Sequence, residues 1–304
     1  MYFKSNSIKV RIVGGLGNQL FGAFFGLAIS ERINTRLVLD ATFVSLGSNP
    51  TRKLAVSEFN LNPFPITIVG TIIEKIPYLT RISLIRKIAS KILRNVKRSI
   101  PEEKVIDSFA FKAGQAFTGY FHKWSYADYF LQRHPSFKLT LKSKSQQLIT
   151  IEKIFKSKDP ICVHVRLGDF LVHSNLYSKL PETYYLESIA QIKKIYLNRE
   201  VWVFTENQSE LSAHYPNLSN ICNFIVDQDT SISDAEAFYL LTTSKFLITS
   251  NSTFSLWAAW FVEKSNNFAI VPSFNTNADL NEGLLDKRWN SVNTETLEFM
   301  LAKK

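Results

Sequence analysis

The second half of this chain alternates short apolar segments with longer helical ones, and this alternation restricts the possible folds more than any other feature. The segments EVWVF (200–204), FIV (224–226) and KFLIT (245–249) have the length and composition of buried strands. We expect helices at 234–243 and 253–261. Strands that alternate with helices of this length predict a parallel, doubly wound α/β sheet.

The N-terminal residues show the beginning of a second α/β arrangement. A strand is expected at 9–13 (KVRIV), and a glycine-rich turn follows it at 14–19. The turn precedes a helix from about 20 to 32, after which a second strand is expected at 36–39. The chain therefore predicts two α/β domains with a cleft between them.

The boundary between the two domains is placed at Asp159-Pro160, which follows a helix expected at 146–156. The regular alternation of strands and helices begins directly after this point. We assign residues 1–157 to the first domain and 158–304 to the second, and expect the last helix of the chain to return to the first domain.

One strand of the second domain carries polar side chains on one face. Its sequence is CVHVRLGD (162–169), in which alternation places His164 and Arg166 on one face and two valines on the other. Gly168-Asp169 ends the strand, so both polar side chains lie near its C-terminal edge, where open α/β sheets bind ligands. A guanidinium there can hold a phosphate or a carboxylate bidentately. The alternative is that Arg166 pairs with an acidic neighbour on a half-buried strand.

The composition favours a soluble protein with anionic partners. The 304 residues are 45% hydrophobic, which is ample for a core, and the formal charge is +10. This charge favours nucleotides, nucleic acid or an acidic membrane surface as partners. Cys162 and Cys222 lie in apolar runs, as buried thiols do in a reducing compartment, and no metal-binding cysteine spacing is present. Because no secretory signal or membrane-spanning segment is evident, we expect a cytoplasmic protein.

Residues 75–98 carry eight basic side chains and no acidic one, with isoleucines at helical spacing between them. A basic amphipathic helix of this type can lie on an anionic membrane. The alternative is a surface helix whose apolar stripe packs on its own domain. We therefore expect that this helix either packs on its own domain or makes a peripheral contact with the inner face of a membrane.

The glycine-rich turn also has two interpretations. Gly15 and Gly17 after a strand, with Asp40 further along, are typical of a dinucleotide-binding site, but Leu20 stands where the third glycine belongs. In the second interpretation, the amides of Asn18 and Gln19 are free to bond a substrate beside a cleft. They could equally cap a helix after a tight turn.

A third site is expected in the segment TSNSTFS (249–255), between a strand and an apolar helix. Ser, Asn and Thr are good N-caps, and the N-terminus of such a helix offers backbone N–H groups and the positive end of the dipole to a phosphate. Asp234 opens the preceding helix, where it either complements the dipole or accepts hydrogen bonds from a guanine edge. His164 could complete recognition of that base.

With these places in view, the chain resembles the inverting α-1,2-fucosyltransferases of glycosyltransferase family 11. The resemblance rests on motifs whose order and spacing are specific. They are GGLGNQLFGAFFGLA (14–28), VHVRLGD (163–169), VFTEN (203–207) and DAEAFYLLTTSKFLITSNSTFSLWAAWF (234–261). They span the chain, although residues 45–155 contribute little.

The resemblance implies a GT-B fold of two Rossmann-like domains that face a cleft. The first domain would lie on the acceptor side, and the second would bind GDP-β-L-fucose without a metal or other cofactor. The acceptor would be a galactose-containing glycan in the synthesis of surface polysaccharide, and nucleic acid would not be a partner. Residue by residue, Arg166 would bind the β-phosphate, His164 and Asp234 the guanine, and a third group the diphosphate: Asn251, Ser252 and Thr253.

On the acceptor and fucose side, the resemblance implies Gly15, Asn18 and Gln19. The general base is unassigned: Asp169 is a candidate, and Glu206 is a weaker one. The family's motif has two adjacent arginines, whereas here the second position is Leu167. Two alternatives remain at this point, namely a nucleotide- or glycan-binding module without turnover and a nicotinamide-dependent dehydrogenase.

Overall fold

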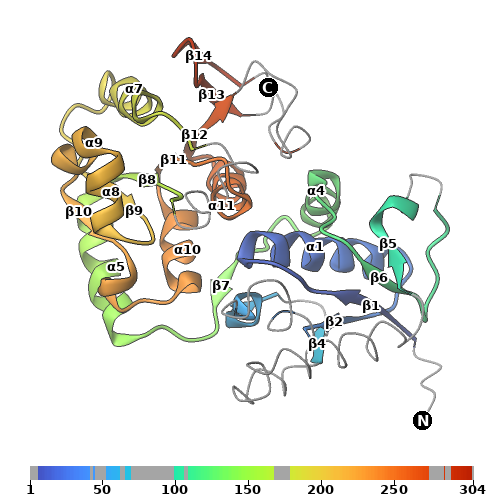
Figure 1. The fold of residues 1–304 in the computed structure, drawn as a ribbon. Helices are drawn as coiled ribbons and strands as arrows, with labels where there is room; N and C mark the ends of the chain where they lie inside the picture. The colour runs from blue at the N-terminus through green and yellow to red at the C-terminus, as the bar shows by residue number, and fades with distance from the viewer. Residues whose placement is uncertain are drawn as a thin grey trace, which may run out of the picture. The chain divides into compact units, whose positions relative to one another are not determined.

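The computed structural model divides the chain into two compact units, residues 1–142 (unit 1) and 143–304 (unit 2) (Figure 1). The division falls earlier than the boundary expected at 157–158, because helix α5 (Gln146–Lys158) belongs to unit 2. Asp159-Pro160 ends that helix, with Asp159 in the left-handed region at φ 48°. The structure describes the following residues: 6–41, 44, 53–61, 66–69, 99–105, 109–167, 179–273, 284 and 289–302.

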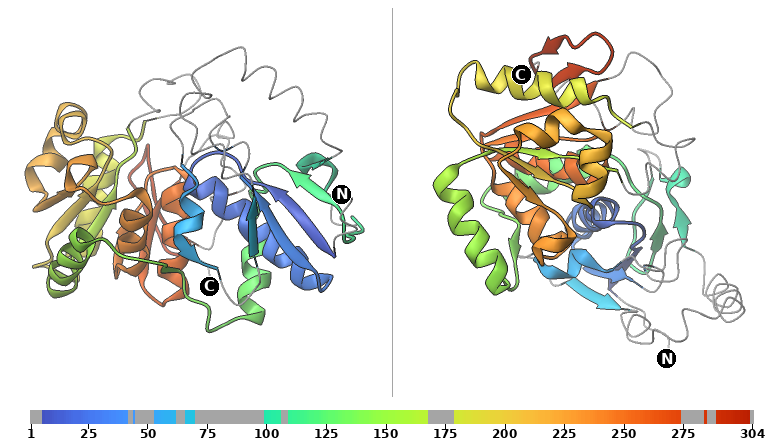
Figure 2. Two further views of the ribbon diagram at one scale, coloured as in Figure 1. Left: turned by 90° about the horizontal axis from the view of Figure 1, so that it is seen from below. Right: turned by 60° about the vertical axis from the view of Figure 1, so that its left-hand side comes forward.

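Unit 1 is built on a parallel sheet with the strand order β4-β2-β1-β6-β5. Its neighbouring strands β1 and β2 are drawn in dark blue in Figure 2. The predicted βαβ beginning is confirmed, and it comprises β1 (Ser7–Arg11), α1 (Leu16–Arg32) and β2 (Arg36–Asp40). The remaining elements of the unit are η1 (Ala55–Glu58), β3 (Phe59–Asn60), β4 (Ile66–Val69), β5 (Ile100–Pro101), η3 (Glu102–Lys104), β6 (Ala116–Thr118), α4 (Trp124–Arg133) and β7 (Thr140–Leu141).

Helix α1 is apolar along most of its length, and most of its residues are buried. Phe25, on this helix, stacks on Phe121 with ring centroids 3.9 Å apart and lies against Phe117 at 5.3 Å. The aromatic-rich segment at 109–124 thus supplies one strand, β6, and much of the packing between that strand and α1. Burial of these large aromatic rings removes apolar surface from water and so stabilises this unit.

Unit 2 is the predicted doubly wound sheet, with the strand order β10-β9-β8-β11-β12-β13-β14. All its strand pairs are parallel except the last one. Its elements after α5 are β8 (Ile161–His164), α7 (Glu182–Lys193), β9 (Val201–Phe204), α8 (Gln208–His214), α9 (Pro216–Ile221), β10 (Phe224–Val226), η4 (Gln228–Thr230), α10 (Asp234–Thr243), β11 (Phe246–Ile248), α11 (Thr253–Lys264), β12 (Phe268–Ser273), β13 (Asn290–Asn293) and β14 (Phe299–Met300).

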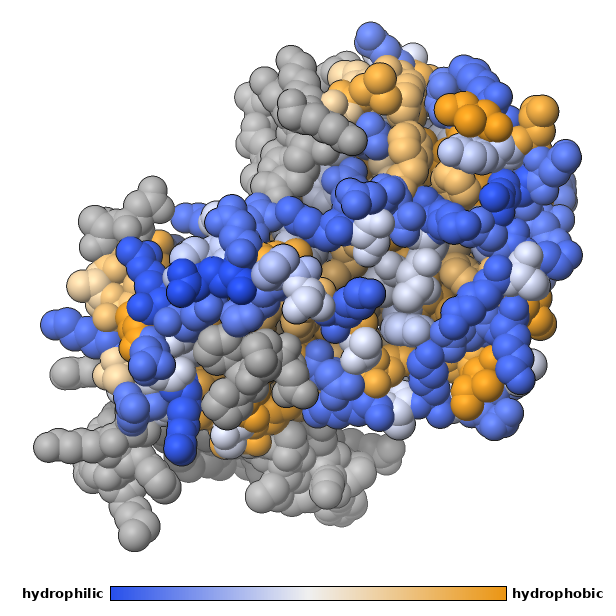
Figure 3. All heavy atoms as spheres, turned by 180° about the vertical axis from the view of Figure 1, so that it is seen from behind, coloured by the Kyte–Doolittle hydropathy of each residue, from blue (hydrophilic) through white to orange (hydrophobic). Residues whose placement is uncertain are grey.

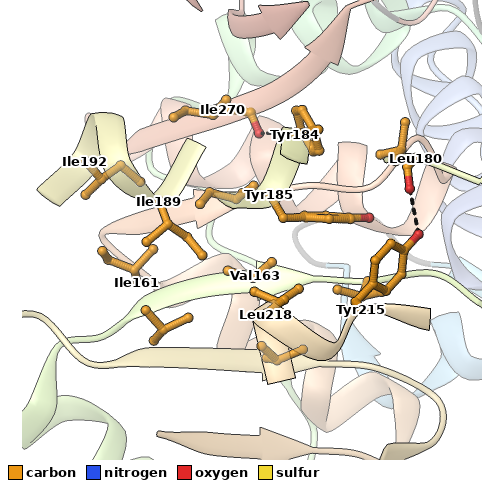
Figure 4. Close-up of a cluster of buried hydrophobic side chains, with 14 of the residues drawn as sticks. Ile161, Val163, Leu180, Tyr184, Tyr185, Ile189, Ile192, Tyr215, Leu218 and Ile270 are labelled. Carbon is orange, nitrogen blue, oxygen red and sulfur yellow. Dashed lines mark hydrogen bonds between the residues drawn. The ribbon is translucent and has the colours of Figure 1, made fainter. Parts of the chain in front are cut away.

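The two faces of this sheet are covered by different helices. Helices α7, α8 and α9 pack on the face that carries Ile161, Val163 and Val165, and together they form a buried cluster (Figure 4). Within it, the Tyr215 hydroxyl donates a hydrogen bond of 2.7 Å to the Leu180 carbonyl. Helix α5 packs on the other face, where Phe155 contacts Trp202 at 5.5 Å between ring centroids. Side chains of β8 therefore face two distinct environments, as their alternation predicts.

The described C-terminal residues 289–302 form β13 and β14, which extend the sheet of unit 2. The expected last helix that returns to the first domain is not found there. Figure 3 shows one face of the molecule, which is mostly hydrophilic with scattered hydrophobic patches. None of the helices in the described part of the chain combines the length and apolarity needed to cross a membrane.

Candidate functional site

The order of strands in unit 2 creates a switch point at the carboxyl ends of β8 and β11. From β8 the chain continues to β9 and β10 on one side, and then passes to β11 on the other side of β8. The connections after β8 and β11 therefore depart in opposite directions. Ligands of open α/β sheets bind in the crevice outside the strands at such a point.

His164 is the last residue of β8 and lies at this switch point. It is buried, its Nδ1 atom is 3.1 Å from the Ser250 hydroxyl, and its ring stacks on Phe254 with centroids 5.0 Å apart. Burial, together with the positive charge of Arg166, lowers the pKa of His164 to about 3. The imidazole is therefore neutral at physiological pH and acts as a hydrogen-bonding group.

Arg166 follows β8 and pairs with a carboxylate. Its Nη1 atom forms an ion pair with Oε1 of Glu206, and Oε2 of Glu206 accepts a hydrogen bond of 3.1 Å from the backbone N–H of Leu167. The pairing of Arg166 with an acidic neighbour is thus confirmed. Glu206 lies just after β9, the strand next to β8. Its carboxylate therefore holds the chain after β8 against the chain after β9.

Leu167 points away from the polar edge, by which we mean the carboxyl end of β8 where His164 and Arg166 lie. It is fully buried in the cluster beneath α7, together with Val163 and Val165. The strand alternation that places Arg166 on the polar side places the next side chain in the core. The position where the resembled family has its second arginine is therefore an apolar core position in this chain.

The residues before α11 form a network of hydroxyl groups. The Ser250 Oγ atom is 3.0 Å from the Oγ atoms of both Ser252 and Ser255, in addition to its contact with His164. Ser252 is the N-cap of α11, where its hydroxyl accepts a hydrogen bond of 3.3 Å from the N–H of Ser255. The predicted capping is confirmed. The network fixes the helix N-terminus, and hence the direction of its first N–H groups, at the switch point.

Other residues of this segment extend the polar edge. Asn251 is buried, whereas Ser252 and Thr253 are partly exposed. The Thr249 hydroxyl is buried and has no hydrogen-bond partner within the described part of the chain. We had not expected Ser250 as the partner of His164. Its position two residues before the N-cap was visible in the sequence, but the pairing joins residues 86 positions apart.

Asp234 begins α10 without capping it. Ser233 and Glu236 form the capping box, with Ser233 Oγ accepting from the Glu236 N–H at 3.2 Å and Glu236 accepting from the Ser233 N–H at 2.9 Å. Asp234 is exposed. Phe238, one turn further on, contacts Phe254 at 5.1 Å between ring centroids, and the same Phe254 ring stacks on His164. The ring contacts therefore join the helix that carries Asp234 to the switch point.

In unit 1 the glycine-rich turn lies at the carboxyl end of β1 and leads into α1, whose N-cap is Gly15. Gln19 is fully buried, and its amide binds the backbone on both sides. Its Nε2 donates to the carbonyls of Gly14 at 3.0 Å and Lys53 at 2.8 Å, while its Oε1 accepts from the Val56 N–H at 3.0 Å. Gln19 thus ties the turn to η1, which is a structural use of an amide expected on the acceptor side.

Asn18 is partly exposed and has a different partner. Its Oδ1 atom is 3.0 Å from Nε2 of His122, a residue that follows β6. Burial lowers the pKa of His122, and the charge of Glu102 partly opposes this shift. His122 was not among the expected site residues, because nothing in the local sequence shows that it lies beside the glycine turn.

Two expected features remain outside this description. Asp169, the first candidate for the general base, lies outside the described residues, as does the basic segment 75–98.

Asp227, in the sequence Asp-Gln-Asp, is the N-cap of η4 and accepts a hydrogen bond of 3.0 Å from the Asp229 N–H. Within the described ranges, no cluster of three His, Cys, Asp or Glu side chains could hold a metal ion.

Comparison with known proteins identifies one matching family profile and two related proteins. The sequence profile of glycosyl transferase family 11 matches residues 7–293. An alpha-1,2-colitosyltransferase of Escherichia coli is 25% identical over 293 residues, which cover 88% of this chain and 91% of that protein. The O-antigen biosynthesis glycosyltransferase WbnK of Escherichia coli is 24% identical over 286 residues, covering 85% and 91%.

A solved structure supports the fold. The NodZ alpha-1,6-fucosyltransferase co-crystallised with GDP superposes with a TM-score of 0.52 at 14% identity, covering 85% of this chain and 93% of that one. Both units of the present chain are Rossmann-like, and together they have the GT-B composition of two such domains. The predicted fold class is therefore confirmed.

Proposed function

The chain belongs to glycosyl transferase family 11, and we propose that it transfers L-fucose from GDP-β-L-fucose to a galactoside hydroxyl with inversion, forming an α-1,2 linkage. One observation carries this proposal. His164 and Arg166, at the end of β8, share the switch point of unit 2 with the capped N-terminus of α11. A cation and a helix N-terminus at one sheet edge suit a sugar nucleotide diphosphate.

In this proposal unit 2 binds the donor. Arg166 holds the β-phosphate, and the start of α11 binds the remaining diphosphate oxygens through backbone N–H groups and polar side chains. His164 and Asp234 read the guanine, with the neutral His164 ring fixed by Ser250. The side chains proposed at the start of α11 are Asn251, Ser252 and Thr253.

Transfer with inversion needs stabilisation of the departing GDP as negative charge develops on it. Arg166 and the positive end of α11 would supply that stabilisation from fixed positions. Glu206 holds Arg166 and the Leu167 N–H, which assigns it to positioning the arginine. Asp169 therefore remains the proposed general base, taking the proton of the acceptor hydroxyl as the new glycosidic bond forms.

The relatives' names bear on the biological setting. The two Escherichia coli relatives act in colitosyl transfer and in O-antigen biosynthesis, according to their names. The name of the second relative supports a surface glycan as the acceptor, and we propose, from the family resemblance, that this glycan contains galactose. The colitosyltransferase also favours a second candidate donor, a nucleotide-activated colitose, which a competition assay against GDP-fucose would distinguish. The family match overturns the nicotinamide-dependent alternative.

The remaining parts of the proposal concern cofactors and membranes. We propose that transfer needs no metal, so EDTA should leave the rate unchanged and added Mg²⁺ or Mn²⁺ should not raise it. We also propose that the basic segment 75–98 brings a cytoplasmic enzyme to the anionic inner face of a membrane. Failure to co-sediment with anionic vesicles at low salt would contradict this last point.

Measurement of GDP release tests the proposed donor reaction. The full chain is incubated with GDP-fucose and a panel of β-galactosides, and GDP release is followed with and without acceptor. We expect release that depends on the galactoside. Binding of GDP without such release would instead support a nucleotide-binding module that does not turn over.

A further inference from the structure

The carboxyl edge of the unit 1 sheet brings together two loops that are far apart in sequence. Strands β1 and β6 are parallel neighbours, with Arg11 opposite Thr118 at their ends. The glycine-rich turn follows β1, and residues 119–123 follow β6, so both loops leave the sheet at the same edge. By the general rule for parallel α/β sheets, this edge is a place for a ligand.

Asn18 and His122 meet between these two loops. Asn18 Oδ1 accepts a hydrogen bond from His122 Nε2 at 3.0 Å. Because the proton is on Nε2, the Nδ1 atom of a neutral His122 carries a lone pair and can accept a further hydrogen bond. The Asn18 Nδ2 group remains a donor. Neither Asn18 Nδ2 nor His122 Nδ1 bonds to another residue in the described ranges.

Gly14 makes room for this arrangement. Its φ of +73° lies in the left-handed region, and a Cβ atom at this position would come within 2.7 Å of Asn18 Nδ2. A side chain at position 14 would therefore displace the Asn18 amide. The glycine of the family motif here serves to keep an amide at the sheet edge.

Tyr120 adds an exposed aromatic ring beside the pair. Its side chain is 47% exposed, and its ring stacks on His122 with centroids 5.2 Å apart and planes at 23°. Phe121, next in the chain, is in the left-handed region at φ 53°, although it is a bulky residue, and its ring is buried against Phe25. Such a strained backbone persists only where the surrounding packing holds it, and it is enriched at functional sites. The anchor at Phe121 fixes the residues on either side of it, Tyr120 and His122.

We propose that Tyr120, His122 and Asn18 form the subsite that binds the acceptor sugar ring. Tyr120 packs its ring against the apolar face of a pyranose, as an amphipathic aromatic side chain can. A sugar hydroxyl both donates and accepts, so it can donate to His122 Nδ1 and accept from Asn18 Nδ2. Gln19, in contrast, holds the loop and does not touch the sugar. This assignment rests on the proposed glycosyl transfer and names the side chains that recognise its acceptor.

The surroundings of His122 support the neutral form that this subsite needs. Burial lowers its pKa, which keeps Nδ1 unprotonated at neutral pH. The charged or titratable groups that act on His122 or contact it are Glu102 from η3 and Tyr120, whose ring stacks on it. Lys123 follows His122 in the chain, and α1 contributes the non-titrating Asn18 and Phe21. Protonation of His122 at lower pH removes the acceptor atom.

The test measures KM for a β-galactoside and for GDP-fucose separately in four variants of the full chain. We expect Tyr120→Ala to raise the acceptor KM about tenfold, and His122→Leu to raise it about 3- to 10-fold, with the donor KM unchanged. His122→Gln recovers the affinity lost in His122→Leu, because its amide can donate to Asn18 and accept from a hydroxyl. Tyr196→Ala, which removes another exposed tyrosine (42% exposed) in unit 2, is the matched control.

The pH dependence provides a readout that a purely structural role would not change. In the wild type the acceptor KM should rise as pH falls from about 7.5 to about 5, and in His122→Gln this rise should disappear. A rise that persists in His122→Gln would contradict the role of His122.

Binding of methyl β-galactoside, followed by saturation-transfer NMR with GDP present, separates this subsite from the proposed reaction. Loss of the signal in Tyr120→Ala and its decrease in His122→Leu support the subsite even if no transfer occurs. An unchanged signal in both variants, or no signal in the wild type, overturns it. Absence of fucosyl transfer together with a signal lost in Tyr120→Ala would overturn the donor assignment alone.

Discussion

The carboxylate of Glu206 contacts two consecutive residues of the chain after β8: its Oε1 pairs with Nη1 of Arg166, and its Oε2 accepts a hydrogen bond from the Leu167 N–H. Both oxygens are thus used in holding one loop. This arrangement favours a positioning role for Glu206, whereas a general base needs an oxygen available to the acceptor hydroxyl.

Glu206→Gln distinguishes these two roles. The amide keeps one acceptor for the Leu167 N–H but loses the charge that pairs with Arg166, so we expect kcat to fall by less than about tenfold, because a general base typically contributes about 10²–10⁴. Steady-state rates of GDP release check the prediction, with Glu210→Gln on α8 as the control. A loss of 10³ or more, at unchanged donor affinity, would assign Glu206 as the base.

Leu167→Arg restores the second arginine of the family motif, and we expect it to destabilise the protein. Leu167 is fully buried in the cluster beneath α7, so the introduced charge would have no partner there. The free energy of unfolding should fall by about 3–5 kcal/mol, as for an unpaired buried charge. Urea denaturation measures this, and Leu167→Met should cost less than about 1.5 kcal/mol. A variant as stable as the wild type would mean that position 167 can face the polar edge.

His164 makes the stability of unit 2 depend on pH. Its pKa of about 3 in the folded protein lies below the value near 6.5 expected in the unfolded chain, so the unfolded state binds more protons between these values. Its contribution is complete above about pH 6.5 and is lost as pH falls toward 3, by about 2 kcal/mol at pH 5. Unfolding free energies of the wild type and His164→Asn should therefore converge or cross on acidification. His214→Asn, at an exposed position, is the control substitution.

Gln19→Leu tests whether this amide is structural. The substitution removes three hydrogen bonds to backbone groups of the turn and η1, and leaves those groups unsatisfied in a buried place. We expect a loss of about 3 kcal/mol in the free energy of unfolding, measured by urea denaturation. Unchanged stability with a weakened acceptor affinity would instead return Gln19 to the acceptor site.

The sequence predicted most of unit 2 because its signals are local. The strands at 200–204 and 224–226 and the helices at 234–243 and 253–261 have apolar runs and caps within a few residues. Helix α4, in contrast, was missed. Its sequence WSYADYFLQR is rich in aromatic residues with little helical preference, and its packing against α1 stabilises it.

The sequence predicted individual residues of the candidate site, but it did not predict which of them contact one another. The polar face of β8 and the cap at Ser252 follow from alternation and from N-cap preference. The Arg166 partner, the His164–Ser250 contact and the Asn18–His122 contact join residues 40, 86 and 104 positions apart. Only the tertiary fold brings such residues together.

NMR analysis of the product formed from GDP-β-L-fucose and a β-galactoside tests the central claim most directly, when the wild type is compared with Arg166→Ala and Asp40→Ala. We expect an α-fucosyl residue on O2 of galactose from the wild type and from Asp40→Ala, and a rate lower by about 10²–10³ from a folded Arg166→Ala. A β-linked or non-O2 product would contradict the proposed reaction. Full activity of Arg166→Ala together with an inactive Asp40→Ala would contradict the site assigned to the end of β8.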